Sequence, residues 1–398
     1  MVTISEESFR ARGEARVRFL DSRLPALDGV RGVAILLVLG HNLALFDTPS
    51  NRVMRAVEFY FDFGWSGVTL FFVLSGFLIT RILLRSQESP TYFRTFYVRR
   101  ALRIFPLYFG LLLACFVVLP AWGTVPEPIA RDLPRQFWYW VFLSNWMAPD
   151  PAGGTALPHL WSLAVEEQFY LVWPWLVHRR TPSQVMRMCI VVAMVGVAAR
   201  AALVWAGVSA EAVYTSSLCR MDALALGGAA AAVTRVPGWL ARVRAIARPL
   251  LYLAAIVFLV GLAFTHNYSR TLPAGQVLGY SLLALVFMLF VLAAAGSAAS
   301  RPSGIVRALQ FGPLRAFGRY SFAMYLFHKP LHEIWGKPLL ESFGLYSTHD
   351  LTISLMYVAT GTLVTFSLGW ASYNLLEKHL LNRRPFDNYR RADEQVRI

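Results

Sequence analysis

The residue best suited to do chemistry is His41. Its imidazole lies within the apolar run Gly32–Phe46, ten residues after Arg31. An ionisable side chain is costly to place in a lipid-spanning helix, and it therefore marks a candidate functional site. Imidazole is also the side chain that exchanges protons most readily near neutral pH. The sequence therefore predicts acid–base chemistry at His41.

Three further apolar segments carry ionisable side chains to a similar depth. At about 1.5 Å per helical residue, His41 and His328 lie about 14–15 Å from the cytoplasmic edge of a bilayer about 30 Å thick. The same calculation places the ionisable residues of two other segments, 160–177 and 216–234, at a similar depth. The predicted layer contains His41, Glu166, Glu167, Arg220, Asp222 and His328. Carboxylates beside an imidazole tune a general base, so the layer predicts a buried catalytic site.

Some of these polar positions also have structural explanations. Arg220 and Asp222 are at least as readily explained as an ion pair inside a helix bundle. Ser75 with Gly76, in the segment SGFLIT, favours a close contact between helices.

A group of arginines precedes and enters the third apolar segment. Six arginines lie between residues 81 and 103, including Arg99, Arg100 and Arg103. Arg100 and Arg103 are three residues apart and share a helix face, on which their guanidinium groups could clamp phosphates. Anchoring of the cytoplasmic loop by positive charge is the competing explanation.

These residues need a membrane domain to position them. Hydrophobic residues make up 56% of the chain and charged residues 15%, and the mean hydropathy is +0.48. These values are far from those of an ordinary soluble domain. The sequence therefore predicts an all-α integral membrane protein with about ten transmembrane helices. The expected spans are roughly 32–46, 65–84, 104–122, 160–177, 186–206, 216–234, 249–266, 277–296, 317–336 and 351–374.

The positive charge sets the predicted orientation of these spans. The formal net charge is +15, and most of the 38 Lys and Arg residues fall in alternate loops. The positive-inside rule then places both termini in the cytoplasm, so the charge requires no nucleic-acid partner. We expect a cytoplasmic N-terminal arm at 1–31, a transmembrane domain at 32–377 and a basic cytoplasmic tail at 378–398. The three cysteines have no metal-ligand spacing, and no metal is expected.

Seven segments, in order along nearly the whole chain, resemble the acyltransferase-3 family of integral membrane acyltransferases. They are LDGVRGVAILLVLGH (27–41), FFVLSGFLITRIL (71–83), the R-x-x-R at Arg100–Arg103, LWSLAVEEQFYLVWP (160–174), CRMDALALGG (219–228), RYSFAMYLFHKPL (319–331) and YNLLEKHLLNRRPF (373–386). Members of this family move acyl groups, usually acetyl, onto sugars and other hydroxyl-bearing acceptors.

The resemblance implies a role for each matching position. His41 would be the catalytic histidine, with Arg31 as its partner, and the R-x-x-R would bind acyl-CoA. The resemblance and the polar layer together imply that the catalytic residues are His41, Glu166 and Glu167. The expected acyl-CoA ligands are Arg99, Arg100 and Arg103. The expected lining of the site is Arg31, Ser75, Trp161, Ser162, Arg220, Asp222, Tyr325 and His328.

The spacing of Arg31 and His41 departs from the family pattern. The family usually has ten residues between the basic residue and the histidine, whereas this chain has nine. Ten helical steps of about 100° leave the two side chains roughly 80° apart. Either Arg31 precedes the helix, a local bulge restores the register, or Arg31 has another role.

The predicted activity is transfer of an acetyl or other acyl group from acetyl-CoA to a hydroxyl of a cell-envelope or exported glycan, at the cytoplasmic (inner) membrane. His41 would act as a base or as an acyl carrier. Glu166 or Glu167 would orient its ring, and Arg220 or a helix donor would hold the oxyanion. One alternative is acylation of a glycosylated secondary metabolite such as a macrolide. Another is a proton-coupled transporter that uses the same buried His and Glu layer. The oligomeric state is left open.

Overall fold

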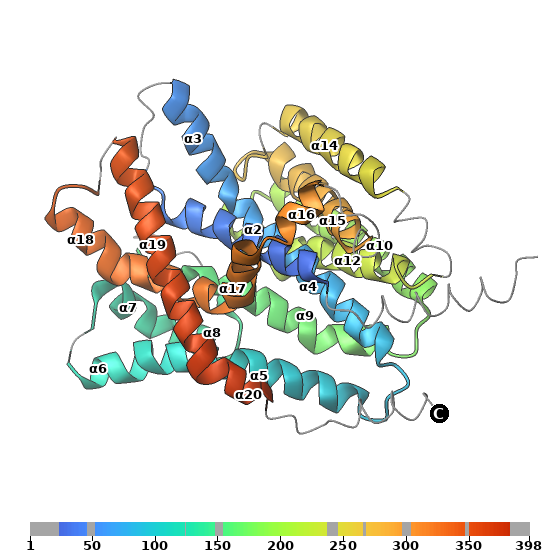
Figure 1. Cartoon of the computed structure of the whole chain (residues 1–398), viewed down its shortest axis with the longest axis horizontal. Helices are drawn as coiled ribbons and strands as arrows, with labels where there is room; N and C mark the ends of the chain where they lie inside the picture. Colours follow the sequence, from blue (N-terminus) through green and yellow to red (C-terminus); the bar gives the residue numbers. More distant parts are fainter. Residues whose placement is uncertain are drawn as a thin grey trace, which may run out of the picture. The chain divides into compact units, whose positions relative to one another are not determined.

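The computed structural model describes residues 24–45, 52–123, 125–147, 154–236, 246–265, 268–296, 304–346 and 350–382. All regular elements within these ranges are helices (Figure 1), so the predicted all-α fold is confirmed. Most of the expected N-terminal arm and of the basic tail lies outside the described residues.

The ten segments expected to span the bilayer all form helices. They correspond to α2 (Pro25–Leu43), α4 (Ser66–Arg85), α5 (Tyr92–Leu113), α9 (Trp161–Val177), α10 (Pro182–Trp205), α12 (Ser217–Val233), α14 (Ala247–Phe264), α15 (Tyr280–Gly296), α17 (Gly312–Leu331) and α19 (Leu351–Ser372).

Within the described ranges, six helical stretches are long and apolar enough to cross a membrane. They are Pro25–Leu43, Val57–Arg85, Tyr92–Ala121, Pro182–Trp205, Gly275–Gly296 and Leu351–Leu380. Helices α9 and α12 have 17 residues each, below the usual length of about 20 for a span. The chain is thus a multi-pass membrane protein, while ten spans and cytoplasmic termini stay predictions.

Shorter helices and turns connect and extend these elements. The short α-helices are α3 (Arg52–Asp62), α6 (Leu119–Ala121), α7 (Glu127–Asp132), α8 (Gln136–Trp140), α11 (Ala210–Thr215), α16 (Gly304–Leu309), α18 (Lys337–Ser342) and α20 (Lys378–Asn382). The 3₁₀ turns are η1 (Phe63–Trp65), η3 (Leu133–Arg135), η4 (Ser144–Trp146) and η5 (Pro158–Leu160). The π-helical turns are η2 (Ala114–Val118), η6 (Gly275–Gly279), η8 (His332–Gly336) and η9 (Tyr373–Glu377).

The chain folds into two compact units. The first contains Met1–Leu37, Trp65–Arg81 and Arg179–Arg319, and the second contains Val38–Gly64, Ile82–His178 and Tyr320–Ile398. Because the units interleave along the sequence, α2, α4 and α17 each contribute residues to both.

In the first unit, glycines allow α4 and α12 to touch backbone to backbone. A Cβ atom at Gly76 would lie 1.9 Å from the carbonyl oxygen of Leu224, and one at Gly227 would lie 2.0 Å from that of Val73. The expected small-residue contact at Gly76 is therefore confirmed. Helix α10 packs along α12 in the same unit (Figure 1).

A similar contact explains the glycines of the LDGVRG motif. A Cβ atom at Gly29 would lie 1.8 Å from the carbonyl oxygen of Leu309, and one at Gly318 would lie 1.8 Å from that of Asp28. These distances are far below van der Waals contact, so only glycine fits at either position. The start of α2 is thus fixed against α16 and α17 by close packing.

In the second unit, tyrosine hydroxyls tie α5 to α9. Tyr92 donates a hydrogen bond to the carbonyl oxygen of Pro174 at 3.2 Å, and Tyr97 donates one to that of Leu171 at 2.7 Å. Pro174 has no N–H group and therefore interrupts the hydrogen-bond ladder of α9. These two hydrogen bonds hold the C-terminal half of α9 against α5.

A buried carboxylate organises the segment that leads into α9. Asp132 accepts hydrogen bonds from the hydroxyl of Tyr139 at 2.7 Å and from the N–H groups of Ala156 at 2.9 Å and Leu157 at 3.0 Å. Burial raises the pKa of Asp132, and the three hydrogen bonds oppose that shift. Ala156 and Leu157 directly precede η5, so Asp132 fixes the position at which His159 enters the fold.

The contact between α4 and α12 predicts that Gly76→Ala destabilises the protein. The new methyl group would meet the backbone of Leu224, and overpacking of this kind costs about 1–3 kcal/mol or more. Thermal unfolding in detergent should show a lower midpoint for this variant.

Gly110→Ala is the matched control, because a Cβ atom at this position of α5 has nothing within 4 Å. Alanine also favours a helix more than glycine does. An equal loss of stability in the two variants would contradict the close packing inferred at Gly76.

Candidate functional site

His41 lies in the last turn of α2 and is held by a backbone carbonyl. Its Nδ1 atom is 3.2 Å from the carbonyl oxygen of Phe61, and the side chain is half-buried. Phe61 is in the last turn of α3, which continues through η1 directly into α4. Because a carbonyl only accepts hydrogen bonds, this contact places the proton of a neutral ring on Nδ1. Nε2 is then the basic nitrogen of His41.

Arg31 lies well inside α2, which is regular from Pro25 to Leu43. Neither a late helix start nor a bulge therefore brings Arg31 onto the face of His41. The guanidinium of Arg31 is instead 3.9 Å from the carboxylate of Asp28, one turn earlier. The remaining alternative, a role for Arg31 other than direct pairing with His41, stays a prediction.

Glu166 and Glu167 form a polar cluster with Arg100. The hydroxyl of Tyr170 donates to Glu166 at 2.9 Å. The guanidinium of Arg100 lies over the ring of Tyr170, 5.5 Å from its centroid, and over that of Phe96 at 5.9 Å. Arg100 also interacts electrostatically with both carboxylates. One arginine of the R-x-x-R motif is thus joined to the two predicted catalytic acids.

The other two arginines of this region have different surroundings. Arg99 is exposed, whereas Arg103 is half-buried and interacts electrostatically with Glu377. Since α5 is regular here, Arg100 and Arg103 share one helix face, as expected from their spacing. Their binding of acyl-CoA stays a prediction.

A second polar cluster joins η5, α9 and α17. The hydroxyls of Ser162 and Tyr325 are 2.6 Å apart, and Tyr325 also donates to the carbonyl oxygen of His159 at 3.0 Å. The rings of His159 and His328 have centroids 5.0 Å apart at an interplanar angle of 70°. The structure therefore brings together Ser162, Tyr325 and His328, three residues expected to line the site. Trp161, half-buried at the start of α9, precedes Ser162.

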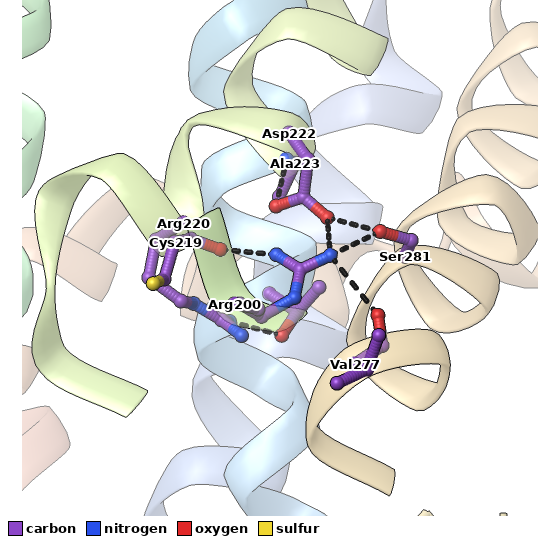
Figure 2. Close-up of polar contacts among 8 residues, drawn as sticks. Arg200, Cys219, Arg220, Asp222, Ala223, Val277 and Ser281 are labelled. Atoms are coloured by element: carbon purple, nitrogen blue, oxygen red, sulfur yellow. Dashed lines mark hydrogen bonds and ion pairs between the residues drawn. The ribbon is translucent and has the colours of Figure 1, made fainter. Parts of the chain in front are cut away.

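In the first unit, Asp222 is paired with Arg200 rather than with Arg220. Arg200 donates to the carboxylate of Asp222 at 2.9 Å, and both side chains are buried. Ser281 bonds to both partners, and Arg200 also donates to the carbonyl oxygens of Cys219 and Val277 (Figure 2). The structural pairing expected between Arg220 and Asp222 is wrong, because residues two apart on a helix do not face each other.

Arg220 has a separate environment of aromatic rings. Its guanidinium donates to the hydroxyl of Thr69 at 2.6 Å. It also lies over three rings, at centroid distances of 5.5 Å for Phe72, 5.1 Å for Tyr214 and 4.9 Å for Tyr280. Such stacking stabilises a cation away from water. The expected oxyanion-binding role of Arg220 stays a prediction.

The predicted polar layer is divided between the two units. His41, Glu166, Glu167 and His328 belong to the second unit, and Arg220 and Asp222 belong to the first. Ser75, half-buried on α4, also belongs to the first. The common depth of all six layer residues therefore stays a prediction.

Three important residues were not assigned a role from the sequence. Arg200 is an arginine within the apolar run AMVGVAARAALVW, which is itself a signal of a buried partner. His159 directly precedes the motif LWSLAVEEQFYLVWP. The carbonyl of Phe61 has no sequence signature, because every residue supplies the same backbone group.

The comparisons with known proteins agree with the sequence motifs. The sequence profile of acyltransferase-3, described as an acyltransferase domain, matches residues 24–374. The peptidoglycan O-acetyltransferase OatA of Listeria monocytogenes is 27% identical over 94% of this chain and 58% of its own length. The O-acetyltransferase OatA of Staphylococcus aureus is 27% identical over 77% of this chain and 50% of its own length. The chain spans about half the length of these curated relatives. No solved structure matches.

The buried pair in the first unit predicts that Asp222→Ala is strongly destabilising. The substitution would leave the guanidinium of Arg200 buried without a counter-charge, which costs about 3–5 kcal/mol. The double variant Arg200→Met with Asp222→Leu should regain much of this loss, since it removes both charges. Thermal unfolding in detergent measures both effects.

The control is Glu127→Ala, which removes the exposed ion pair with Arg131. Exposed pairs contribute little to stability, so this variant should unfold like the unmodified protein. A double variant no more stable than Asp222→Ala would contradict the interpretation of the buried pair.

Proposed function

We propose that this chain, which belongs to the acyltransferase-3 family, is an O-acyltransferase that transfers an acetyl group from acetyl-CoA to a hydroxyl of a cell-wall glycan. The observation that carries the proposal is the hydrogen bond from His41 Nδ1 to the carbonyl of Phe61, since it makes Nε2 the base. The names of the relatives support a glycan acceptor rather than a secondary metabolite or a transported solute. The enzyme would act in the cytoplasmic membrane.

The reaction begins with proton transfer to His41. As the acceptor oxygen attacks the thioester carbonyl, Nε2 takes the hydroxyl proton. The tetrahedral intermediate then collapses, the bond from carbon to sulfur breaks, and the imidazolium returns the proton to the departing thiolate of CoA. Throughout, the carbonyl of Phe61 holds the Nδ1 proton and keeps the ring oriented.

Glu166 or Glu167 would supply the negative charge that balances this imidazolium. In the resting protein, both side chains interact electrostatically with Arg100. The two acids, Arg100 and Tyr170 would thus form the electrostatic support of the base.

The cytoplasmic end of α5 would bind the donor. The phosphates of CoA are multiply charged, and arginine binds such groups with two parallel hydrogen bonds. Arg99, which is exposed, and Arg103, which is half-buried, are the arginines that we assign to this role. Arg100 would link the donor site to the carboxylates.

Replacement of His41 should abolish transfer without unfolding the protein. His41→Ala removes the base, and His41→Asn removes it while keeping an N–H that can donate to Phe61. Release of free CoA from acetyl-CoA with soluble peptidoglycan fragments should fall by about 10²–10⁴-fold in both variants. His41→Asn should unfold at nearly the unmodified temperature. A folded His41→Asn protein with the full rate of CoA release would overturn the assignment.

The arginines should differ in their kinetic effects. Arg103→Gln removes a phosphate ligand and should raise KM for acetyl-CoA about 10–100-fold, the equivalent of one or two charged hydrogen bonds. Arg100→Gln should mainly lower kcat, because it disturbs the carboxylates. Steady-state CoA release at varied acetyl-CoA concentration separates the two effects.

Arg94→Gln is the control, because Arg94 is exposed on α5 but lies outside the R-x-x-R motif. It should leave KM for acetyl-CoA within about twofold of the original value. Equal changes in KM for Arg94→Gln and Arg103→Gln would indicate general surface attraction instead of a phosphate clamp.

A further inference from the structure

His159 and His328 are buried histidines that each keep one ring nitrogen without a hydrogen-bond partner. Their exposed fractions are 7% and 0%. Nδ1 of His159 and Nε2 of His328 have no partner in the structure. Buried polar atoms in proteins nearly always have a partner, so two such atoms in adjacent rings need an explanation.

The other nitrogen of each ring defines its tautomer. Nε2 of His159 is 3.2 Å from the carbonyl oxygen of Leu326, and Nδ1 of His328 is 2.7 Å from that of Tyr325. Because carbonyls only accept hydrogen bonds, these nitrogens carry the protons of the neutral rings. Nδ1 of His159 and Nε2 of His328 are therefore both hydrogen-bond acceptors with a bare lone pair.

The neighbouring hydroxyls do not supply the missing donors. Tyr325 donates to the carbonyl of His159 at 3.0 Å, and Ser162 lies 2.6 Å from the Tyr325 hydroxyl and 3.3 Å from the same carbonyl. Both hydroxyl protons are thus directed at oxygen atoms. Ser162 and Tyr325 are positioning residues that hold His159 in place.

A metal ion is a poor occupant for this pair of nitrogens. Protein metal sites usually take three or four ligands, and no group of three or more His, Cys, Asp or Glu side chains in the described part of the chain is arranged to hold one. The site needs ligands that donate hydrogen bonds and carry no charge, because a neutral imidazole has only a lone pair to offer.

We propose that Nδ1 of His159 and Nε2 of His328 accept hydrogen bonds from hydroxyl groups of the acyl acceptor. The proposal rests on the O-acyltransferase function proposed above and adds the groups that recognise its polyol substrate. A buried acceptor without a donor is unfavourable, so a sugar that supplies two donors gains affinity where a deoxy analogue does not. The ring centroids are 5.0 Å apart, so one sugar is large enough to contact both rings.

Four conservative variants separate ligand binding from structural support. His328→Asn keeps a donor near the Nδ1 position for the carbonyl of Tyr325 but removes the bare nitrogen, and His159→Gln does the same for Nε2 and Leu326. Conversely, His328→Gln and His159→Asn keep an oxygen acceptor near the bare nitrogen but lose the donor to the carbonyl.

The measurement is KM for soluble peptidoglycan fragments in detergent or nanodiscs, with CoA release as the readout and thermal unfolding in parallel. We expect His328→Asn and His159→Gln to raise KM for the acceptor about tenfold, with little change in kcat, in KM for acetyl-CoA or in the unfolding temperature. We expect His328→Gln and His159→Asn to unfold at lower temperature but to keep more of the acceptor affinity.

The opposite ranking would overturn the proposal. If His328→Asn and His159→Gln keep the original acceptor KM, the two nitrogens bind only water or nothing. If the unmodified protein releases CoA and the His41 variants do not, the proposed function holds even when this inference fails. Absence of any CoA release from the unmodified protein would instead refute the proposed function itself.

Discussion

The structure depends on one constraint, which is that polar groups on apolar helices must find their partners inside the protein. Water is scarce in a bilayer, and an unsatisfied buried polar group is expensive there. Arg200 illustrates the solution, because its guanidinium is shared among Asp222, Ser281 and two backbone carbonyls (Figure 2). One of these carbonyls, that of Val277, lies in the π-helical turn η6, where the helix ladder is irregular.

The same constraint determines the chemistry of the histidines. His41, His159 and His328 each place one ring nitrogen against a backbone carbonyl. A carbonyl fixes the tautomer without adding charge, whereas a carboxylate would favour the imidazolium. Neutral imidazoles with a defined basic nitrogen are therefore the species that this fold stabilises. Glu166 and Glu167 interact electrostatically with Arg100.

The sequence predicts the helices well because apolar length and composition determine them locally. All ten expected segments are helical, and the contact at Gly76 follows from its small size. The partners of the charged residues could not be predicted in the same way. Asp222 binds Arg200, which is 22 positions away along the chain, because the packing of α10 on α12 decides which side chains meet. Arg220 is only two positions from Asp222 along the chain, but it contacts Thr69 and three aromatic rings.

The glycine contact between α4 and α12 has a consequence for biosynthesis. Ribosomes deliver α4 to the membrane early, but its partner α12 and most of the first unit are made only after Ile82–His178 of the second unit. The surface of α4 around Gly76 therefore lacks its partner until Ile82–His178 and then α12 have been synthesised and inserted. The second unit is also incomplete at that stage, since it needs the helices that follow Tyr320. The close contact between α4 and α12 is therefore a late step of assembly, although α4 is among the first helices to be synthesised.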